Sequence, residues 1–541
     1  MPMTDESRYT NYRVPTGNGQ TLCVPPWDTL EDLLLANGKY RQAYSCDIQG
    51  RSLAQLAEEA RTAALAEASA YTRSYTDAPG EVLADGPLIL SGHQPDLVHP
   101  GVWLKNFAAA GLAASSGGTA IHLIIDSDVC RQTAIRVPTG TIEQPRVETV
   151  AYDQAVAGVP HEERPIVDRA TWDSFATRTA NTIAPFLSAP LVTSWWPEAI
   201  AHARATSSLG LAMAQARHRL ELQWQSNSLE LPQSRICQTT PFRWFAMHLL
   251  AHLRRFHSAY NHALADYRRE HRLRNHAQPV PDLAETDGWL EAPFWIWSTD
   301  NPHRRALFVR PECQELLLTD RFGWQDTLPA SADSEAAPAV ERLAEWEARG
   351  IKLRTRAMMT TLFARLLLAD VFIHGIGGAK YDQVTDQICR QFFGFAPPDY
   401  ITLSGTLRLP IDHPSVSSAQ ELQLRQSLRN LTYHPETYAS NLELDRDERS
   451  QVEAVIAKKR AWVQSAPTPV NAAERHHNIV AANRALQPWL ASRRADLERE
   501  LTIVRQQLRA KKILESREYA FCLFPHDSLR NFLLDFLPSI P

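Results

Sequence analysis

The sequence predicts an α/β protein with a parallel sheet, a helical insertion and a helical C-terminal region. Two strand–loop–helix–strand segments, Pro87–Ile125 and Asp370–Leu409, carry this prediction, together with the long helical patterns between and after them. A strand, a helix and a second strand in so short a stretch form a βαβ unit, whose two strands run parallel. Hydrophobic residues make up 44% and charged residues 22%, which is typical of a globular protein, and 541 residues predict more than one lobe.

The first part of the chain leads into the first βαβ unit. Residues 1–50 contain only short patterns, so we expect irregular structure there, and an alanine-rich helix follows over Arg51–Tyr75. The apolar run Pro87–Ser91 is typical of a buried strand. A polar loop then leads to a predicted helix over Gly101–Ala114 and a second strand over Thr119–Ile125.

The middle of the chain changes character twice. Helical patterns cover Ala201–Gln223 and Pro241–Arg272, and strand-like runs follow at Pro293–Trp297 and Arg305–Arg310, which indicate a return to a sheet. The polar segment Arg274–Asp282 between them is a linker or a loop with substrate contacts. The second βαβ unit is then assembled from successive predicted elements: a helix over Ile351–Ala369, a strand over Asp370–His374, a helix over Lys380–Phe393 and a strand over Tyr400–Leu409.

The tail is helical, charged and free of glycine. Predicted helices cover Leu444–Val463 and Ala472–Lys512, Pro467 and Pro469 supply the turn between them, and the leucine spacing is typical of a helical hairpin or coiled coil. We expect Tyr519–Phe524 and an apolar helix over Leu529–Leu537 to return to the body. The domains predicted are residues 1–165, the first half of the core; 166–280, a helical insertion; 281–425, its second half; and 426–541, the helical tail.

Composition excludes several classes of function. A net charge of −5 gives no basic excess for binding nucleic acid. The N-terminal residues are polar and do not resemble a signal peptide, and no apolar stretch approaches the ~20 residues of a membrane span. Seven scattered cysteines without a C-x-x-C pair argue against a zinc ribbon or a disulfide framework. We therefore expect a cytoplasmic protein that acts on a small molecule.

The loop after the first strand is a candidate anion site. It joins a strand to a helix N-terminus, where unpaired N–H groups and the helix dipole attract anions. Its polar groups are contributed by Gly92, His93, Gln94, His99, Lys105 and Asn106. The histidines and Lys105 are suited to phosphate; alternatively, the histidines cap the loop and Lys105 is a solvated residue. Asp126 and Asp128 end the next strand and would bind Mg²⁺, a ribose or an amine, or only cap a turn.

A second loop repeats this arrangement at the other βαβ unit. Its candidate binding residues are His374, Gly375, Gly377, Gly378, Lys380, Tyr381 and Asp382. Glycines let a backbone approach a ligand closely, although the spacing is neither a dinucleotide-binding fingerprint nor a P-loop. Alternatively, Asp382 complements the helix dipole and Asp386 is a surface acid. The alternating Lys352, Arg354 and Arg356 form a solvated face or, if they face the cleft, a clamp for a carboxylate or phosphate.

These loops resemble those of the cysteine-adding enzymes of bacillithiol biosynthesis. That family has a G-Q-Q-P loop before a G-P-L-Y-T-x-x-K helix, which is similar to Gly92-His-Gln-Pro95 followed by Pro100–Lys105. Its E-D-H-D stretch corresponds to Asp126-Ser-Asp128, and its G-G-P-G-E-x-x-Y turn is similar to the segment from His374 to Tyr381. The chain has His93 for a glutamine and Ala379 or Lys380 for a glutamate, so the resemblance is to a distant relative.

The resemblance implies a Rossmann-like ligase core, helical insertions and a homodimer formed through a C-terminal coiled coil. It also implies that His93 and His99 hold the phosphates of ATP or ADP, with Asp126 and Asp128 as further catalytic residues and Mg²⁺ as a possible metal. The function expected is a ligase or transferase that joins a cysteine-like amino acid to a small acceptor. A hydrolase on the same scaffold and a non-catalytic nucleotide-binding scaffold remain alternatives.

Overall fold

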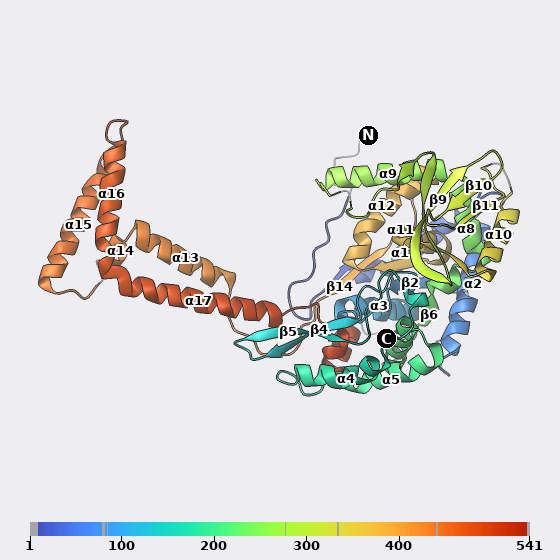
Figure 1. Cartoon of the computed structure of the whole chain (residues 1–541), viewed down its shortest axis with the longest axis horizontal. Helices are drawn as coiled ribbons and strands as arrows, with labels where there is room; N and C mark the ends of the chain where they lie inside the picture. Colours follow the sequence, from blue (N-terminus) through green and yellow to red (C-terminus); the bar gives the residue numbers. More distant parts are fainter. Residues whose placement is uncertain are drawn as a thin grey trace. The chain divides into compact units, whose positions relative to one another are not determined.

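The computed structural model describes residues 9–77, 82–83, 85–275, 277–332, 335–439 and 442–537 of a mixed α/β protein (Figure 1). The chain divides into two compact units. The first contains the residues up to Val137, then Thr149–Leu409 and the residues from Arg517 onward. The second contains Pro138–Glu148 and Pro410–Ser516.

A six-stranded, mostly parallel sheet forms the centre of the first unit. Its strand order is β1-β14-β13-β2-β3-β6, and all neighbours pair in parallel except β1, which is antiparallel to β14. The strands are β1 (Thr21–Val24), β2 (Leu88–His93), β3 (Thr119–Ile124), β6 (Leu229–Pro232), β13 (Val371–His374) and β14 (Ile401–Gly405). The predicted parallel strands are therefore confirmed, and the two βαβ units lie side by side in one sheet.

The two βαβ units leave the middle of this sheet in opposite directions. Helix α3 (Pro100–Ser116) links β2 to β3, and α12 (Ile376–Phe392) links β13 to β14. Because β2 and β13 are neighbours, the strand order reverses between them. In open α/β sheets such a reversal leaves a crevice outside the carboxyl ends of the strands, where ligands bind. Both predicted loops follow strands at this point.

A second sheet, antiparallel throughout, contains the strand-like runs of the middle region. Its order is β11-β10-β9-β8-β12, with β7 on β8. The strands are β7 (Glu285–Thr286), β8 (Trp289–Ser298), β9 (Asn301–Pro311), β10 (Leu316–Thr319), β11 (Gln325–Leu328) and β12 (Ile351–Thr355). The two predicted strands are confirmed, but they pair with each other, separately from the parallel sheet.

The predicted helix over Ile351–Ala369 is wrong at its start. The segment begins as β12, continues as α11 (Ala357–Phe363) and ends in a π-helical turn, Ala364–Leu368. The alternation of Ile351, Leu353 and Thr355 has the period of a strand. Lys352 and Arg354 alternate with these residues and are typical of the exposed face of a helix, but Arg354 is buried.

Helices surround both sheets of the first unit. They are α1 (Leu30–Gln42), α2 (Leu53–Arg73), α4 (Arg169–Ile183), α5 (Val192–Thr206), α6 (Leu209–Gln223), α7 (Gln233–Ile236), α8 (Thr240–Ala251), α9 (Leu253–Glu270), α10 (Ala337–Ala348) and α18 (His526–Leu534). Helix α1 lies in a region expected to be irregular. Each of the two long predicted helices is two helices: Ser207, with a φ of 53°, separates α5 from α6, and His252 separates α8 from α9.

The second unit is mainly helical. Its helices are α13 (Ser418–Tyr433), α14 (Glu436–Ala439), α15 (Arg446–Gln464), α16 (Ala472–Leu486) and α17 (Ala491–Leu514), and it includes the tip of the hairpin β4 (Ala134–Gly140)–β5 (Pro145–Ala151). Helices α15 and α16 pack as the predicted helical hairpin (Figure 1). The predicted second helix is interrupted by a 3₁₀ turn, Pro488–Leu490. The hydrophobic core of the second unit includes Leu431, Ile456, Leu486 and Leu497.

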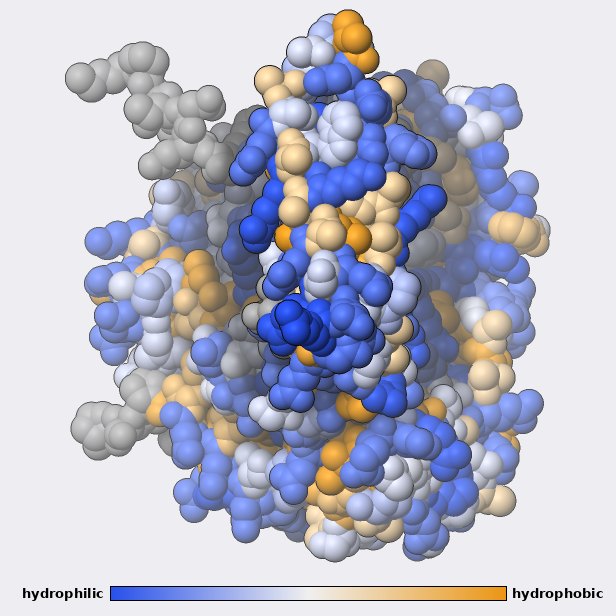
Figure 2. Space-filling view, turned by 90° about the vertical axis from the view of Figure 1, so that its left-hand side faces the viewer, coloured by the Kyte–Doolittle hydropathy of each residue, from blue (hydrophilic) through white to orange (hydrophobic). Residues whose placement is uncertain are grey.

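The end of the chain returns to the first unit, as predicted. Phe521 donates a backbone hydrogen bond to Val98 at 2.8 Å, and its ring centroid lies 4.5 Å from that of Trp103 in α3. The face of the molecule in Figure 2 is mostly hydrophilic, with hydrophobic residues in small groups. In the part of the chain that the structure describes, no helix has both the length and the apolarity needed to cross a bilayer.

Candidate functional site

A hollow of about 750 Å³ lies at the carboxyl edge of the parallel sheet. Gln94 and Asp96 enter it from the loop after β2, Asp128 from the loop after β3, and Tyr381 from the first turns of α12. Its volume is in the range of small-molecule sites. We call this hollow the cleft. It brings together residues from both predicted loops at the point where the strand order reverses.

Asp128 is held in its charged form by three neighbours. Gln94 Nε2 donates to its Oδ2 at 2.9 Å, and Arg304 Nη1 and the Val129 backbone N–H donate to its Oδ1 at 2.8 and 2.9 Å. Burial alone would raise the pKa of Asp128, but Arg304 and these hydrogen bonds bring it below its ordinary value. A fixed negative charge therefore lies in the cleft wall.

Asp96 behaves in the opposite way. Burial, followed by the negative charge of Asp128, raises the pKa of Asp96 to about 7. The Nε2 of His161 lies 3.5 Å from Asp96 Oδ1, and burial lowers the pKa of this histidine to about 4. At neutral pH His161 is uncharged and Asp96 is divided between its two protonation states. Asp96 can therefore accept or release a proton in the cleft.

Sequence reasoning did not select Asp96. It selected the histidines of the same loop, as groups that would hold phosphates, and passed over this carboxylate. The only signal for Asp96 was its position, two residues beyond Gln94, at the end of a buried strand. Its raised pKa depends on burial and then on the charge of Asp128, which follows a different strand, and both causes arise only in the folded sheet.

His93 and His99 do not line the cleft. His93 Nδ1 lies 3.0 Å from the carbonyl of Gln94, and burial, with Lys105, lowers its pKa to about 3. His99 is the N-cap of α3: its Nδ1 accepts from Gly101 N–H at 3.1 Å. Burial and Arg517 lower the pKa of His99 to about 4. The loop-capping alternative therefore describes His99.

The start of α3 is closed, in contrast to the prediction of an open anion site. Lys105 is buried and donates through Nζ to the carbonyl of Gly92 at 2.8 Å, so the solvated alternative for this lysine is wrong. Burial and Arg217 lower the pKa of Lys105 to about 8. Asn106 Nδ2 donates to a buried glutamate at 2.9 Å. A Cβ on Gly101 would lie 2.0 Å from a carbonyl of β14, which shows how closely this helix end is packed.

The start of α12 is open. Gly375 is its N-cap and makes no side-chain capping bond, and Gly377 and Lys380 are exposed. Tyr381 lines the cleft, and its hydroxyl would lie 3.6 Å from a Cβ on Gly377. A helix N-terminus with uncapped N–H groups favours an anion. Of the two predicted anion sites, only this second loop leaves its helix N-terminus accessible beside the cleft.

Asp382 lies beneath this loop and does not line the cleft. It is buried, with Arg365 Nη1 and Thr361 Oγ1 each at 2.6 Å and His374 Nε2 at 2.9 Å. Burial would raise the pKa of Asp382, but Arg365 and His374 hold it well below its ordinary value. Gly378 is needed here because a Cβ would lie 2.8 Å from the His374 ring. Asp382 and His374 therefore support the loop from below.

Asp386 is not the surface acid that the sequence suggested as an alternative. Its carboxylate also pairs with Arg365, at 2.8 Å, and its side chain is 19% exposed. Burial raises the pKa of Asp386 to about 6, although Arg365 opposes the shift.

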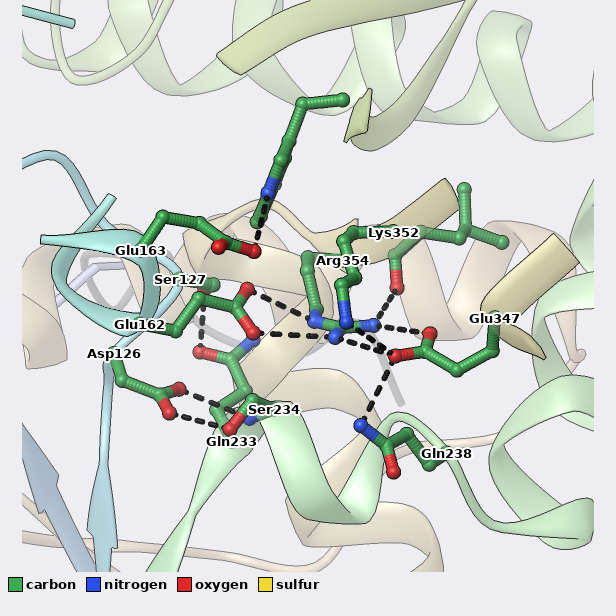
Figure 3. Close-up of polar contacts among 12 residues, drawn as sticks. Asp126, Ser127, Glu162, Glu163, Gln233, Ser234, Gln238, Glu347, Lys352 and Arg354 are labelled. Atoms are coloured by element: carbon green, nitrogen blue, oxygen red, sulfur yellow. Dashed lines mark hydrogen bonds and ion pairs between the residues drawn. The ribbon is translucent and has the colours of Figure 1, made fainter. Parts of the chain in front are cut away.

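Asp126 and the basic strand belong to a buried polar network (Figure 3). Both oxygens of Asp126 accept from Ser234, one from its backbone N–H at 2.9 Å and one from its hydroxyl at 2.5 Å. Arg354, fully buried, pairs with Glu162 and Glu347 at 3.1 and 3.0 Å. This network joins β12 to the loops after the parallel strands. Arg354 is therefore neither a solvated residue nor an anion clamp.

The acidic pair after β3 does not fit a Mg²⁺ site. Both carboxylates of Asp126 and Asp128 are occupied by hydrogen-bond donors, and Mg²⁺ requires free oxygen ligands. Among the residues that the structure describes, no group of three or more His, Cys, Asp or Glu side chains could hold a metal ion. We therefore assign no chemical step to a metal at this position.

The outer wall of the cleft comes from segments that the sequence did not single out. Arg131, Gln132 and Tyr152 line it from the first unit's β4–β5 region. The segment Arg274–Asp282, interpreted from the sequence as a linker or a loop with substrate contacts, contributes Ala277 and Pro279–Pro281 to the wall, whereas His276 lies outside the described residues. This loop therefore occupies the position of a substrate-contacting loop.

No protein-family model matches this chain. No curated protein matches it either. The likeness to the cysteine-adding enzymes of bacillithiol biosynthesis therefore rests on the loop motifs alone.

Proposed function

We propose that the chain is a ligase- or transferase-like enzyme that joins an amino-acid-like amine to a small acceptor in the cleft. The observation that carries this proposal is that two carboxylates, Asp96 and Asp128, line the same cleft as Tyr381 from the first turns of α12. One side of the cleft is suited to a cationic amine and the other to an anionic group. The reversed strand order supports a Rossmann-like core, in which ligands occupy this crevice.

The acidic side of the cleft would bind and activate the amine. Asp128 stays ionised and offers its charge to an ammonium group, whereas Asp96 can take a proton near neutral pH. An α-amino group has a pKa of about 8, close enough to that of Asp96 for transfer at neutral pH. As the amine nitrogen bonds to the electrophilic carbon of the acceptor, its proton passes to Asp96. The bond to the leaving group breaks, and the leaving group keeps the electron pair.

The opposite side would stabilise the leaving group. The N–H groups of Gly377 and Gly378 and the ammonium of Lys380 are the accessible positive groups at the start of α12. If ATP or ADP binds, these groups suit its phosphates, and the nucleotide would supply an activated phosphate as leaving group. This assignment moves phosphate binding to the second loop, because His93 Nδ1 and Lys105 Nζ already contact backbone carbonyls of the first loop.

Nucleotide binding can be tested by thermal shift with ATP, ADP and AMP. A ligand at a hundred times its Kd stabilises the folded protein by about 2.7 kcal/mol, which a melting curve detects. We expect at least one nucleotide to raise the melting temperature. Lys380→Ala should lose most of this shift and His93→Ala should keep it. The reverse order would return phosphate binding to the first loop, and no shift with any nucleotide would remove the nucleotide part of the proposal.

The reaction class can be tested by incubating the protein with amino acids and small acceptors, with and without ATP. Formation of a condensation product, lost in Asp96→Asn, is expected. Hydrolysis without any nucleotide would favour the hydrolase alternative. Nucleotide binding with no turnover of any substrate would favour a non-catalytic scaffold.

A further inference from the structure

Two further hollows of the first unit lie next to the cleft. The first, about 420 Å³, shares Pro279 and Tyr381 with the cleft and is also lined by His271 and Lys380. We call it the passage. The second, about 460 Å³, shares Leu273 with the passage. The three hollows therefore adjoin in the order cleft, passage and outer hollow.

The outer hollow is lined mainly by arginines, and we call it the arginine pocket. Besides Leu273, its lining residues are Ala265, Arg268, Arg269, Arg272, Arg274 and Asp282. This concentration of positive charge occurs in a chain whose net charge is −5. A local excess of arginine in a hollow is therefore a feature of this site and does not reflect the chain's composition.

The arginines differ in how they are held. Arg268 is buried, and its guanidinium donates to Asp282 at 2.7 Å and to the carbonyls of Gln278 and Val280 at 2.9 and 2.7 Å. These bonds fix the wall of the pocket to the loop that also lines the cleft. Arg269 is exposed and pairs with Asp266, whose side chain is largely shielded, at 2.5 Å.

Arg272 and Arg274 are exposed, and within the described ranges neither side chain has a hydrogen-bond or ion-pair partner. The helix dipole does not account for them. Cations are favourable in the last turn of a helix, and Arg268 and Arg269 already occupy that turn of α9. Arg272 and Arg274 follow the end of the helix, where the backbone of Arg272 has a φ of 52°. Both line the same hollow, and a guanidinium group without a partner favours an oxyanion, to which its fork can donate two parallel hydrogen bonds.

We infer that the arginine pocket binds the phosphate end of an elongated substrate or cosubstrate whose reactive end lies beside Asp96. The inference rests on the proposed function and specifies the substrate class: a phosphomonoester or diphosphate connected by a spacer that fills the passage. A nucleic acid fits less well. The basic surface is limited to one hollow and is flanked by Asp266, Glu270 and Asp282.

The test measures binding of inorganic pyrophosphate by isothermal titration to the full-length protein and to Arg272→Ala/Arg274→Ala. We expect the double variant to bind at least about tenfold more weakly, since two charge-assisted contacts are lost. The matched control is Arg254→Ala/Arg255→Ala, which removes the same charge from the other end of α9; both of these arginines are exposed and neither lines the pocket. If pyrophosphate binding is weakened equally in both double variants, the loss of net charge explains the effect and the inference is overturned.

Further outcomes separate this inference from the proposed function. Asp96→Asn should bind pyrophosphate as tightly as the wild type. If Arg272→Ala/Arg274→Ala no longer binds pyrophosphate but no condensation of an amine is found, the arginine pocket is supported and the proposed reaction is refuted. If condensation depends on Asp96 while pyrophosphate binds equally to all variants, the reaction stands and the pocket fails. Weakened binding of duplex nucleic acid in this variant, with no binding of pyrophosphate, would also overturn the inference.

Discussion

Asp96 should titrate near pH 7, and this can be measured without knowing the substrate. With a pKa of about 7 in place of the ordinary 3.8, about one tenth of the Asp96 carboxyls are ionised at pH 6 and about nine tenths at pH 8. A raised carboxyl pKa means that folding favours the protonated form. The stability that this contributes is fully present below the ordinary pKa and is lost as the pH rises through 7.

The variant Asp96→Asn removes this titration and keeps the shape of the side chain. Its melting temperature should therefore rise relative to that of the wild type between pH 6 and pH 8. Because the Asp96 side chain is 39% exposed, solvent screening makes the difference smaller than the pKa shift alone would suggest. The assay is differential scanning calorimetry of both proteins from pH 5 to pH 8.5.

The control for this experiment is Asp173→Asn, which removes a carboxylate that is 51% exposed, lies outside the cleft and pairs with an arginine instead of a histidine. Its melting temperature should run parallel to that of the wild type over this pH range. Parallel curves for Asp96→Asn as well would refute the raised pKa and with it the role of Asp96 as a proton acceptor. Once a substrate is known, this variant should also reduce kcat about 10²–10⁴-fold, the usual loss when a general base is removed.

Three further predictions concern packing and assembly. Arg354→Met removes the arginine partner of Glu162 and leaves Glu347 with Lys352 alone, so it should lower the free energy of unfolding by about 3–5 kcal/mol in urea titrations. Lys352→Met, which loses one partly exposed pair, should cost about 1 kcal/mol or less, and similar losses in the two variants would contradict the network's role. Gly101→Ala should cost about 1–3 kcal/mol because its Cβ meets a carbonyl at 2.0 Å, whereas Gly38→Ala, with open space around it in α1, should be neutral or stabilising; equal effects would argue against the close helix–strand contact. If the helical unit pairs two copies, light scattering should give twice the chain mass of 60.9 kDa, and the mass of one chain at every concentration would exclude the dimer.

Local patterns predicted the parts of the fold that depend on neighbours in sequence. The apolar run from Pro87 to Ser91, the helix after Pro100 and the strand at Thr119 were all recognisable, because a buried strand and a buried helix each require an uninterrupted apolar surface. Errors occurred where a charged residue is buried. Arg354 lies on a strand, and its charge is balanced by Glu162 and Glu347. Because these glutamates are not its neighbours in the strand, the local sequence wrongly suggested that Arg354 is exposed on a helix.

The sequence by itself determined that two strand–loop–helix units exist and that each loop is polar and lies at the carboxyl end of a strand. Only the tertiary structure decided that the units share one sheet, with β2 beside β13, and that their loops border a common cleft. It also decided which loop is open: α3 is capped by His99 and packed against β14, whereas α12 begins without a cap. The physical reason is that pKa values, helix caps and cavity walls depend on groups brought together by folding, whereas periodicity and turn composition are properties of the local chain.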